Sequence, residues 1–387
     1  MTPKAISEAM GVLCIALAIA GCVYAIAATV LMRRFAGAKR AAAPQASGVT
    51  VLKPLSGAMP GLYEDLVSFC DQDYGGPLQI LFSTGDSNDP SVAIVKRLIA
   101  ERPGCDLEIA LHGPARGPNP KVASLVGLES RIRHETVVLA DADIAVTPDY
   151  LSRTVAALEE PHVGAVTLLY RGIARGGIWA RLASMGIDYH FVPGVVVGLA
   201  LGLARPCFGS TIALRRETLE SIGGFAAFAG CLADDYAIGQ AVRARGMKVV
   251  IPSFFVAHSC SDQSAAELLR HELRWARTIR AVDPLGFAGS IVTHPLPIAL
   301  IGAALTGFGA YGIVAIGAAL ACRLVLQLQV DLTLRVRADR WWLGAARDLL
   351  AIGIHVASYF VSIVSWHGRR YRVRSDGTMI AIGEPNA

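Results

Sequence analysis

The stretch VVLADADIAVTPDY, Val137 to Tyr150, decides how the middle of this chain folds. An apolar run of strand type leads directly into two aspartates one residue apart, Asp141 and Asp143. A strand that ends on carboxylates places them at the edge of a sheet, where a bound group can reach them. The stretch therefore predicts a buried strand with a polar site at its carboxyl end.

The surrounding region, about residues 48–261, alternates between two kinds of segment. The runs GVTVLKPL, LQILFST, DLEIAL and TVVLADADI have strand character. Between them, LYEDLVSFCDQ, SVAIVKRLIAE and KVASLVGLESRI carry apolar residues at helical spacing, and Ser91 is the expected cap of the second helix. This alternation predicts a mostly parallel α/β sheet covered by helices on both faces.

A third acid follows a strand in the same way. Asp86 comes directly after LQILFST, so we expect it at the same edge of the sheet as Asp141 and Asp143. Gathered carboxylates repel one another unless a cation lies between them. Their hard oxygens suit Mg²⁺ or Mn²⁺, which shares its coordination shell with waters and substrate phosphates. A solvated turn is the alternative explanation of an isolated Asp-x-Asp pair.

The composition lies between that of soluble enzymes and that of membrane proteins, so we expect the apolar residues to be clustered. The chain is 53% hydrophobic and only 17% charged. The uncharged run from Ala9 to Met32 is long enough to cross roughly 30 Å of hydrocarbon as a helix. Positive residues follow it at once, which predicts Met1 outside and the next domain in the cytoplasm. These residues are Arg33, Arg34, Lys39 and Arg40. A cleaved signal peptide is the alternative, because IAGC (Ile19 to Cys22) resembles a lipoprotein cleavage site, but the apolar run continues past it.

Two more apolar regions run from about Ile291 to Leu334 and from about Leu343 to Trp366. TGFGAYG, Thr306 to Gly312, is expected to divide the former into two helices, which gives three spans after the middle domain. The positive residues between the two regions suit a cytoplasmic loop: Arg335, Arg337 and Arg340. This count places GRRYRVR (Gly368 to Arg374) outside, against the charge rule. Either the rule fails there, or one segment lies in the membrane interface.

The cysteines and the net charge bear on whether the chain binds zinc, nucleic acid or a membrane surface. The eight cysteines contain no Cys-x-x-Cys pair, which favours buried thiols in a reducing compartment over a structural zinc site. The net charge of +5 fits a domain held against an anionic leaflet. No nucleic-acid-binding module accompanies this charge.

Seven motifs follow one another in the middle region: KPLSG, GDSNDP, NPKV, DAD, FGST, ADDY and HELRW. With the flanking apolar segments, they resemble the ceramide glucosyltransferase-like family of inverting GT-A glycosyltransferases. LGLARPCFGSTIALRRETLE and RHELRWARTIRAVDP resemble its hopanoid-associated branch. The resemblance implies a GT-A fold, which is Rossmann-like with a mostly parallel sheet. It also implies a multi-pass protein of a bacterial-type inner membrane whose catalytic domain faces the cytoplasm.

The resemblance implies roles for the acids at the strand ends. The donor is a UDP-sugar, and Asp86 lies beside its nucleotide. Asp141 and Asp143 hold Mg²⁺ or Mn²⁺ on the diphosphate, where the ion offsets the charge that builds on the leaving UDP. By the same resemblance, further contacts to the donor come from Lys53, Asp141 and Lys121.

The motif ADDY supplies the implied catalytic pair, Asp234 and Asp235. Asp235 matches the catalytic base of the family, which takes the proton of the attacking hydroxyl in a single displacement. The alternative is a helix N-terminus at which both carboxylates simply face the helix dipole.

HELRW departs from the family pattern, whose first position is usually Gln or Arg. His271 stands there, while Arg274 and Trp275 are retained. The family role is to contact the diphosphate and to cover the site near the acceptor. The departure leaves the contribution of His271 open. The alternative is a basic amphipathic helix on anionic lipid, since arginines recur along it: Arg270, Arg274, Arg277 and Arg280.

FVPGVVVGLALGLARP, Phe191 to Pro206, is apolar but rich in Gly and Pro and short for a span. We expect a re-entrant or interfacial segment that leads a lipid acceptor to Asp235; a buried core helix is the alternative. The expected organisation is an N-terminal anchor (1–33), a GT-A domain (48–261) with the apolar segment 191–206, an amphipathic interfacial helix (262–286), C-terminal transmembrane helices (287–366) and a basic tail (367–387).

The sequence thus predicts transfer of a sugar from a UDP-sugar to a hydroxyl of a membrane lipid. The first expectation is a hopanoid polyol that receives N-acetylglucosamine, and the alternative is ceramide. A processive polysaccharide synthase would carry Gln at the first position of the last motif and more pore-forming helices. A transporter would not need acids at the strand ends.

Overall fold

The computed structural model describes residues 2–37, 47–112, 117–336, 341–361, 363–366, 369–373 and 379–382, the last three ranges mainly as backbone. The predicted loop charges Lys39, Arg40, Arg337 and Arg340, and most of the predicted basic tail, lie outside these ranges. The chain divides into two compact units. The helical unit comprises residues 1–38, 178–205 and 263–362, and the sheet unit comprises 39–177, 206–262 and 363–387.

The sheet unit is built on a seven-stranded sheet in the order β3-β2-β1-β4-β8-β6-β9. Its strands are β1 (Val49–Pro54), β2 (Leu78–Thr84), β3 (Asp106–Leu111), β4 (Thr136–Leu139), β6 (Val163–Thr167), β8 (Ile212–Arg215) and β9 (Lys248–Val250). Strands β3, β2, β1 and β4 run parallel, as do β6 and β9, and β8 lies antiparallel between β4 and β6. The predicted mostly parallel sheet is confirmed.

The predicted strand TVVLADADI is two strands joined by a turn. After β4, the chain turns through Ala140–Asp143 and enters β5 (Ile144–Ala145). Strand β5 belongs to a second sheet, where it pairs with β10 (Phe255–Cys260), which in turn pairs with β7 (Leu169–Ala174). The acids Asp141 and Asp143 therefore lie where the chain leaves one sheet for another. A third sheet contains β11 (Ile363–Trp366), β12 (Arg369–Val373) and β13 (Met379–Ala381).

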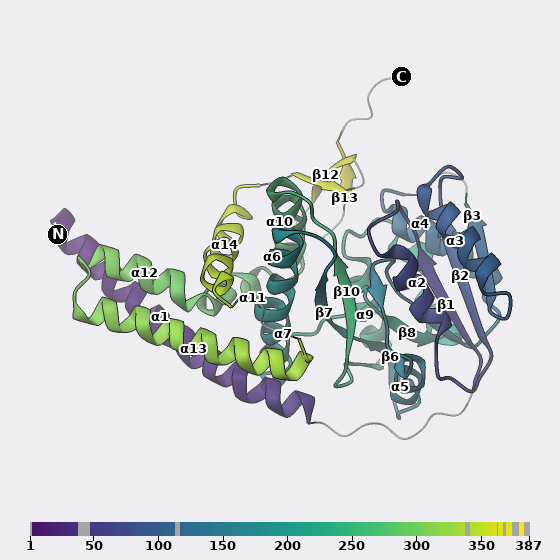
Figure 1. Cartoon of the computed structure of the whole chain (residues 1–387), viewed down its shortest axis with the longest axis horizontal. Helices are drawn as coiled ribbons and strands as arrows, with labels where there is room; N and C mark the ends of the chain where they lie inside the picture. Colours follow the sequence, from purple (N-terminus) through teal and green to yellow (C-terminus); the bar gives the residue numbers. More distant parts are fainter. Residues whose placement is uncertain are drawn as a thin grey trace. The chain divides into compact units, whose positions relative to one another are not determined.

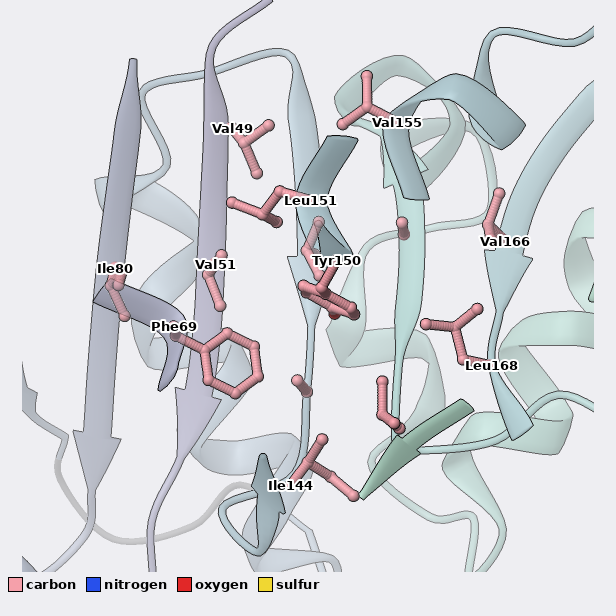
Figure 2. Close-up of a cluster of buried hydrophobic side chains, with 14 of the residues drawn as sticks. Val49, Val51, Phe69, Ile80, Ile144, Tyr150, Leu151, Val155, Val166 and Leu168 are labelled. Carbon is pink, nitrogen blue, oxygen red and sulfur yellow. The ribbon is translucent and has the colours of Figure 1, made fainter. Parts of the chain in front are cut away.

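Helices cover both faces of the large sheet because its strands alternate their buried side chains. Val49 and Val51 of β1 belong to one core cluster, and Leu52 belongs to the other. The first cluster packs against α2 (Leu62–Cys70), α3 (Pro90–Glu101) and α5 (Tyr150–Leu158); Figure 2 shows Phe69 and Tyr150 against the strand residues. The second packs against α4 (Pro120–Leu128), α8 (Arg216–Ser221) and α9 (Asp234–Ala244). The 3-10 turn η3 (Phe225–Phe228) adds two phenylalanines to this cluster, and a second 3-10 turn, η1 (Glu129–Arg131), follows α4.

The cap of α3 differs from the sequence prediction. Ser91 lies inside the helix, and the cap is Asp89, whose Oδ1 accepts from the Ser91 N–H at 2.8 Å. Pro90 occupies the first turn, where its missing N–H and its preferred φ cost nothing. The Asp89 carboxylate also accepts from the Gly57 N–H at 2.8 Å. It therefore ties the loop after β2 to the loop after β1, which a serine hydroxyl two residues later does not do.

The helical unit contains α1 (Pro3–Ala36), α6 (Ile178–Gly186), η2 (Ile187–Phe191), α7 (Val192–Ala200), α10 (Ala265–Val282), α11 (Pro284–Gly289), η4 (Ser290–Thr293), α12 (Pro295–Leu305), α13 (Ala310–Leu334) and α14 (Leu343–Ala357). Helices α1, α12 and α13 pack alongside one another (Figure 1). Glycines allow this close approach, since a Cβ at Gly302 would lie 2.9 Å from Cγ1 of Ile15. The predicted division of the second apolar region is confirmed by the break between α12 and α13.

Among the described residues, three helices are long and apolar enough to cross a membrane: α1, the continuous helix Ile178–Ala200, and α13. The bent pair Pro284–Thr293 and Pro295–Leu305, at 70°, would make a fourth span if counted as one. The region Leu343 to Trp366, predicted as a span, differs. Helix α14 has 15 residues, fewer than the roughly 20 that a span requires, and Trp366 belongs to β11.

The apolar segment 191–206 falls mainly in the helical unit, where α7 continues the helix of α6 and η2. Val196 is buried, whereas Leu201 and Leu203, beyond the end of α7, are 63% and 74% exposed. The segment thus has a packed half and an exposed apolar half.

Candidate active site

The turn that carries Asp141 is held from beneath by Lys53. The Lys53 ammonium donates to the backbone carbonyl of Asp141 at 2.6 Å and lies 3.9 Å from the centre of the Phe69 ring. The side chain is fully buried. Burial lowers the pKa of Lys53 to about 7 despite the nearby carboxylates of Asp143, Asp141 and Asp65. Lys53 therefore supports the turn from beneath, and its predicted contact with the donor stays a prediction.

Lys121 joins two of the predicted site acids. Its Nζ lies 2.6 Å from Asp141 Oδ1 and 3.5 Å from Asp234 Oδ2. Lys121 belongs to the first turn of α4, and Asp234 to the first turn of α9, so the ammonium bridges elements far apart in sequence. Burial opposes its charge, but the carboxylates of Asp141, Asp234 and Asp235 outweigh burial and raise the pKa of Lys121.

Asn119 connects the starts of the same two helices. Its Oδ1 accepts from the Val122 N–H at 3.2 Å, which caps α4. Its Nδ2 donates to the Cys231 carbonyl at 2.9 Å and to Asp234 Oδ1 at 3.2 Å. The Asn119 side chain is fully buried. These hydrogen bonds therefore form away from water, where a donor or acceptor without a hydrogen bond would destabilise the fold. Asn119 thus fixes where Asp234 stands relative to Lys121.

Asp235 is held by two backbone N–H groups. Its Oδ2 accepts from Gly209 at 2.9 Å, and its Oδ1 accepts from Tyr236 at 2.8 Å. The residue is only partly buried, so a ligand can approach it. Burial, and then the charge of Asp234, raise the pKa of Asp235 to about 6 against the pull of Lys121. A carboxylate with this pKa is ionised near neutral pH and is a stronger proton acceptor than an ordinary aspartate.

Gly209 lies between Asp235 and the turn of Asp141 because β8 runs antiparallel to β4. The register pairs Leu139 with Ile212, so the residues before β8 lie beside the end of β4. The Gly209 carbonyl accepts from the Asp141 N–H at 3.1 Å. A Cβ at this position would lie 2.6 Å from Asp141 Oδ2 and 2.7 Å from Lys121 Nζ. Only glycine leaves room for the ion pair.

The second acid of the pair, Asp143, faces a histidine from the small sheet. His258 pairs with Ile144 in the register of β10 and β5, and its Nδ1 lies 3.4 Å from Asp143 Oδ1. Burial disfavours the charged imidazole, but the nearby Asp143 carboxylate outweighs burial and raises the pKa of His258.

Asp86 is exposed just after β2, and its Oδ1 accepts from the Asn88 N–H at 2.8 Å. Strands β2 and β4 flank β1, so Asp86 and Asp141 emerge at one edge, separated by roughly 10 Å at two strand spacings. The sheet therefore gathers the predicted acids at its carboxyl edge. These are Asp86, Asp141 and Asp143, with Asp234 and Asp235 beside the latter two.

The residues at the turn fit a hard divalent ion. Asp141 and Asp143 offer carboxylate oxygens from one turn, and the Asp141 side chain is 35% exposed. Because residue 209 is a glycine, no side chain from that residue covers Oδ2 of Asp141. In the part of the chain that the structure describes, no group of three or more His, Cys, Asp or Glu could hold a metal by itself. Such an ion would take its other ligands from water and a diphosphate, as Mg²⁺ does at phosphate sites.

His271, Arg274 and Trp275 lie on α10 in the helical unit. The centres of the His271 and Trp275 rings are 4.3 Å apart. Glu272, the residue after His271, forms an ion pair with Arg347 of α14 at 2.8 Å. Their predicted contacts with a donor remain predictions.

Three residues at the site were not among those predicted: Gly209, Asn119 and His258. The first two belong to the quoted motifs FGST and NPKV, which marked their loops without indicating what they bind. No local signal marks His258, because only the pairing of β10 with β5 brings it to Asp143.

The amino-acid sequence of the chain is similar to those of known glycosyltransferases. The model of glycosyl transferase family 21 matches residues 13–379. Ceramide glucosyltransferase 1 of Caenorhabditis elegans is 25% identical over 267 residues, which are 69% of this chain and 56% of that protein. Ceramide glucosyltransferase of Komagataella phaffii is 35% identical over 119 residues, 30% of this chain and 23% of that protein. The match spans about half the length of the first of these relatives.

Among solved structures, a mannosyltransferase from Pyrobaculum calidifontis in complex with GDP-Man and Mn²⁺ is similar with a TM-score of 0.53. It is 21% identical, and the match covers 92% of this chain and 99% of that chain. At this identity the likeness concerns the fold. The predicted GT-A-like α/β fold is confirmed.

Proposed function

Since the chain belongs to glycosyl transferase family 21, we propose that it moves a sugar from a nucleotide sugar to a hydroxyl of a membrane lipid. The observation that carries the proposal is that two sets of aspartates lie close together at one edge of the sheet. Asp141 and Asp143 stand on the turn after β4, and Asp235 is tied to the neighbouring Gly209 N–H at 2.9 Å. Single displacement requires one set of groups that binds the donor, here Asp141 and Asp143, and a base beside the acceptor, here Asp235.

Asp235 is the proposed general base. Its pKa of about 6 keeps it ionised at neutral pH, and the N–H groups of Gly209 and Tyr236 fix its orientation. It takes the proton of the acceptor hydroxyl as the oxygen attacks the anomeric carbon, and the product has inverted configuration. Asp234, held by Asn119 and Lys121, keeps the first turn of α9 in place.

Asp141 and Asp143 are the proposed ligands of Mg²⁺ or Mn²⁺. When bound, such an ion supplies positive charge to the diphosphate of the leaving nucleotide. Lys121, within reach of Asp141 and Asp234, adds a second positive charge at this edge of the sheet. Asp86, exposed one strand beyond β1, is the proposed contact for the nucleoside of a UDP-sugar. The roles predicted for His271, Arg274 and Trp275 stay predictions.

For the acceptor, the comparisons favour ceramide over the hopanoid polyol that the sequence first suggested. The curated relatives described above are named ceramide glucosyltransferases, so we propose a sphingoid lipid hydroxyl as acceptor and glucose as the sugar. The apolar helices support a membrane location. A bacterial inner membrane, with the sheet unit in the cytoplasm, is the proposed setting.

The test is transfer by the full-length protein in lipid nanodiscs. Ceramide and a hopanoid polyol are each offered with UDP-glucose and with UDP-N-acetylglucosamine, and products are identified by mass spectrometry and the anomeric configuration by NMR. A β-linked glucosylceramide supports the proposal. Transfer to the hopanoid alone would identify the other acceptor, and no transfer to any lipid would contradict the function.

The metal is tested in the same assay. Asp143→Asn should lower transfer at least about 100-fold, because it removes a charge and a hard ligand. Full activity of the unaltered enzyme in excess chelator would show that Asp141 and Asp143 do not act through a divalent ion. Asp106→Asn, on an exposed acid at the start of β3, is the matched control.

A further inference from the structure

The Lys121 ammonium already binds one oxygen of the Asp141 carboxylate, which is a proposed metal ligand. The distance of 2.6 Å to Asp141 Oδ1 is that of a charge-assisted hydrogen bond. The lysine is 15% exposed and the aspartate 35% exposed, so water screens the pair only in part. A divalent ion on the other oxygen, Oδ2, would lie close to this ammonium, so the two cations compete for the negative charge of one carboxylate.

A second partner for Lys121 lies close by. Among the residues that the structure describes, none donates a hydrogen bond to the buried Asp234 Oδ2, although Lys121 Nζ is only 3.5 Å away. A movement of the ammonium by about 1 Å would bring it to hydrogen-bonding distance of that oxygen. Gly209 leaves the space beside Nζ open, since any Cβ there would lie 2.7 Å from it. Lys121 thus has two possible acceptors and satisfies one of them.

We propose that Lys121 is an internal counter-cation that keeps Asp141 neutralised until a nucleotide diphosphate arrives, so that the protein binds its divalent ion and the nucleotide together. This inference rests on the proposed function. The protein alone offers two carboxylates, one of them held by Lys121 and the other facing His258. The diphosphate brings the negative charge that lets two cations share this region, while Lys121 turns toward Asp234.

The consequence is a thermodynamic coupling between metal and nucleotide. In the absence of nucleotide, binding the ion at Asp141 weakens the Lys121–Asp141 bond and brings two cations close together, and both effects oppose binding. A hydrogen bond to a charged group changes an equilibrium by roughly 10- to 100-fold. Because coupling is reciprocal, Mn²⁺ should increase the affinity for UDP by the same factor by which UDP increases the affinity for Mn²⁺.

The experiment measures Mn²⁺ binding to the full-length protein by electron paramagnetic resonance, with and without UDP. For the unaltered protein, UDP should tighten Mn²⁺ binding at least about 10-fold. Lys121→Met, which keeps the length of the side chain and removes its charge, should bind Mn²⁺ without UDP at least about 10-fold more tightly than the unaltered protein. Its coupling with UDP should shrink accordingly. Lys96→Met, on an exposed lysine of α3, is the control and should change neither affinity.

Two results would overturn the inference. One is Mn²⁺ binding by Lys121→Met that is equal to or weaker than that of the unaltered protein, which would make Lys121 a support of the metal site. The other is equal Mn²⁺ affinity of the unaltered protein with and without UDP, a measurement that does not depend on the folding of any variant. Failure of the proposed metal role has a different signature: no Mn²⁺ binds to any form even with UDP, while UDP still binds in chelator.

Discussion

The backbone N–H of Gly209 donates to Asp235 Oδ2 at 2.9 Å, while the carbonyl of the same glycine accepts from the Asp141 N–H at 3.1 Å. One peptide segment therefore sets the distance between the proposed base and the turn that carries the proposed metal ligands. A change at this position should affect both at once.

Gly209→Ala should lower transfer about 10- to 100-fold, because its Cβ would lie 2.6 Å from Asp141 Oδ2 and 2.7 Å from Lys121 Nζ. Overpacking of this kind typically costs about 1–3 kcal/mol. Initial rates and thermal unfolding would be measured together. Gly104→Ala, where a Cβ would contact nothing within 4 Å, is the control. Activity equal to that of the unaltered protein would show that the two acids tolerate displacement.

Asp235→Asn should reduce transfer by about 10²- to 10⁴-fold, the usual contribution of a general base. Binding of the UDP-sugar should be unchanged, because the base acts on the acceptor. Calorimetry of donor binding and a transfer assay separate the two effects. Residual transfer within a few-fold of the unaltered enzyme would remove Asp235 from the proposed role.

The pH dependence follows from the same carboxylate. The pKa of Asp235 is raised from 3.8 to about 6, so the protonated, inactive form accumulates as the pH falls through about 6. We expect kcat/KM to fall about tenfold per pH unit below that value. Donor binding, measured over the same range, is the control for general loss of structure. A rate that stays constant down to pH 4.5 would contradict the assignment.

Asn119→Ala should loosen the starts of α4 and α9 together. The change removes the cap of α4 and leaves Asp234 Oδ1 and the Cys231 carbonyl without their buried donor. Loss of a cap and of buried hydrogen bonds should lower the free energy of local opening by about 2–4 kcal/mol. Hydrogen exchange across residues 120–128 and 234–244 measures this. Asn88→Ala, on an exposed side chain, should leave both helices protected.

Leu203→Asp should weaken membrane association and lipid transfer while donor binding is retained. Leu203 is 74% exposed in the helical unit, and a charge costs roughly 2.5–3.5 kcal/mol at mid-bilayer and less at the interface. Vesicle flotation and donor calorimetry are the measurements. Val196→Asp differs because Val196 is buried, and it should unfold the helical unit. Unchanged flotation of Leu203→Asp would show that this surface does not meet the membrane.

Much of the fold could be predicted because its signals are local. The apolar runs that became β1, β2 and β4 reflect strands buried on both faces. The helical spacing of α2, α3 and α4 reflects one buried face on each helix. The placement of Asp86, Asp141 and Asp143 after strands followed from the parallel order. The cap of α3 is Asp89 and not the predicted Ser91, because the Asp89 carboxylate accepts from the N–H groups of both Ser91 and the distant Gly57.

The alternating α/β pattern, the acids at the strand ends and the apolar segments can be read from the amino-acid sequence, since each depends on neighbours within a few residues. Three contacts could be found only in the folded chain: Lys53 is buried under the turn, Lys121 bridges Asp141 and Asp234, and His258 lies against Asp143. These contacts join residues that are tens to more than a hundred positions apart. Their partners are selected by strand register and helix packing, which no local pattern records.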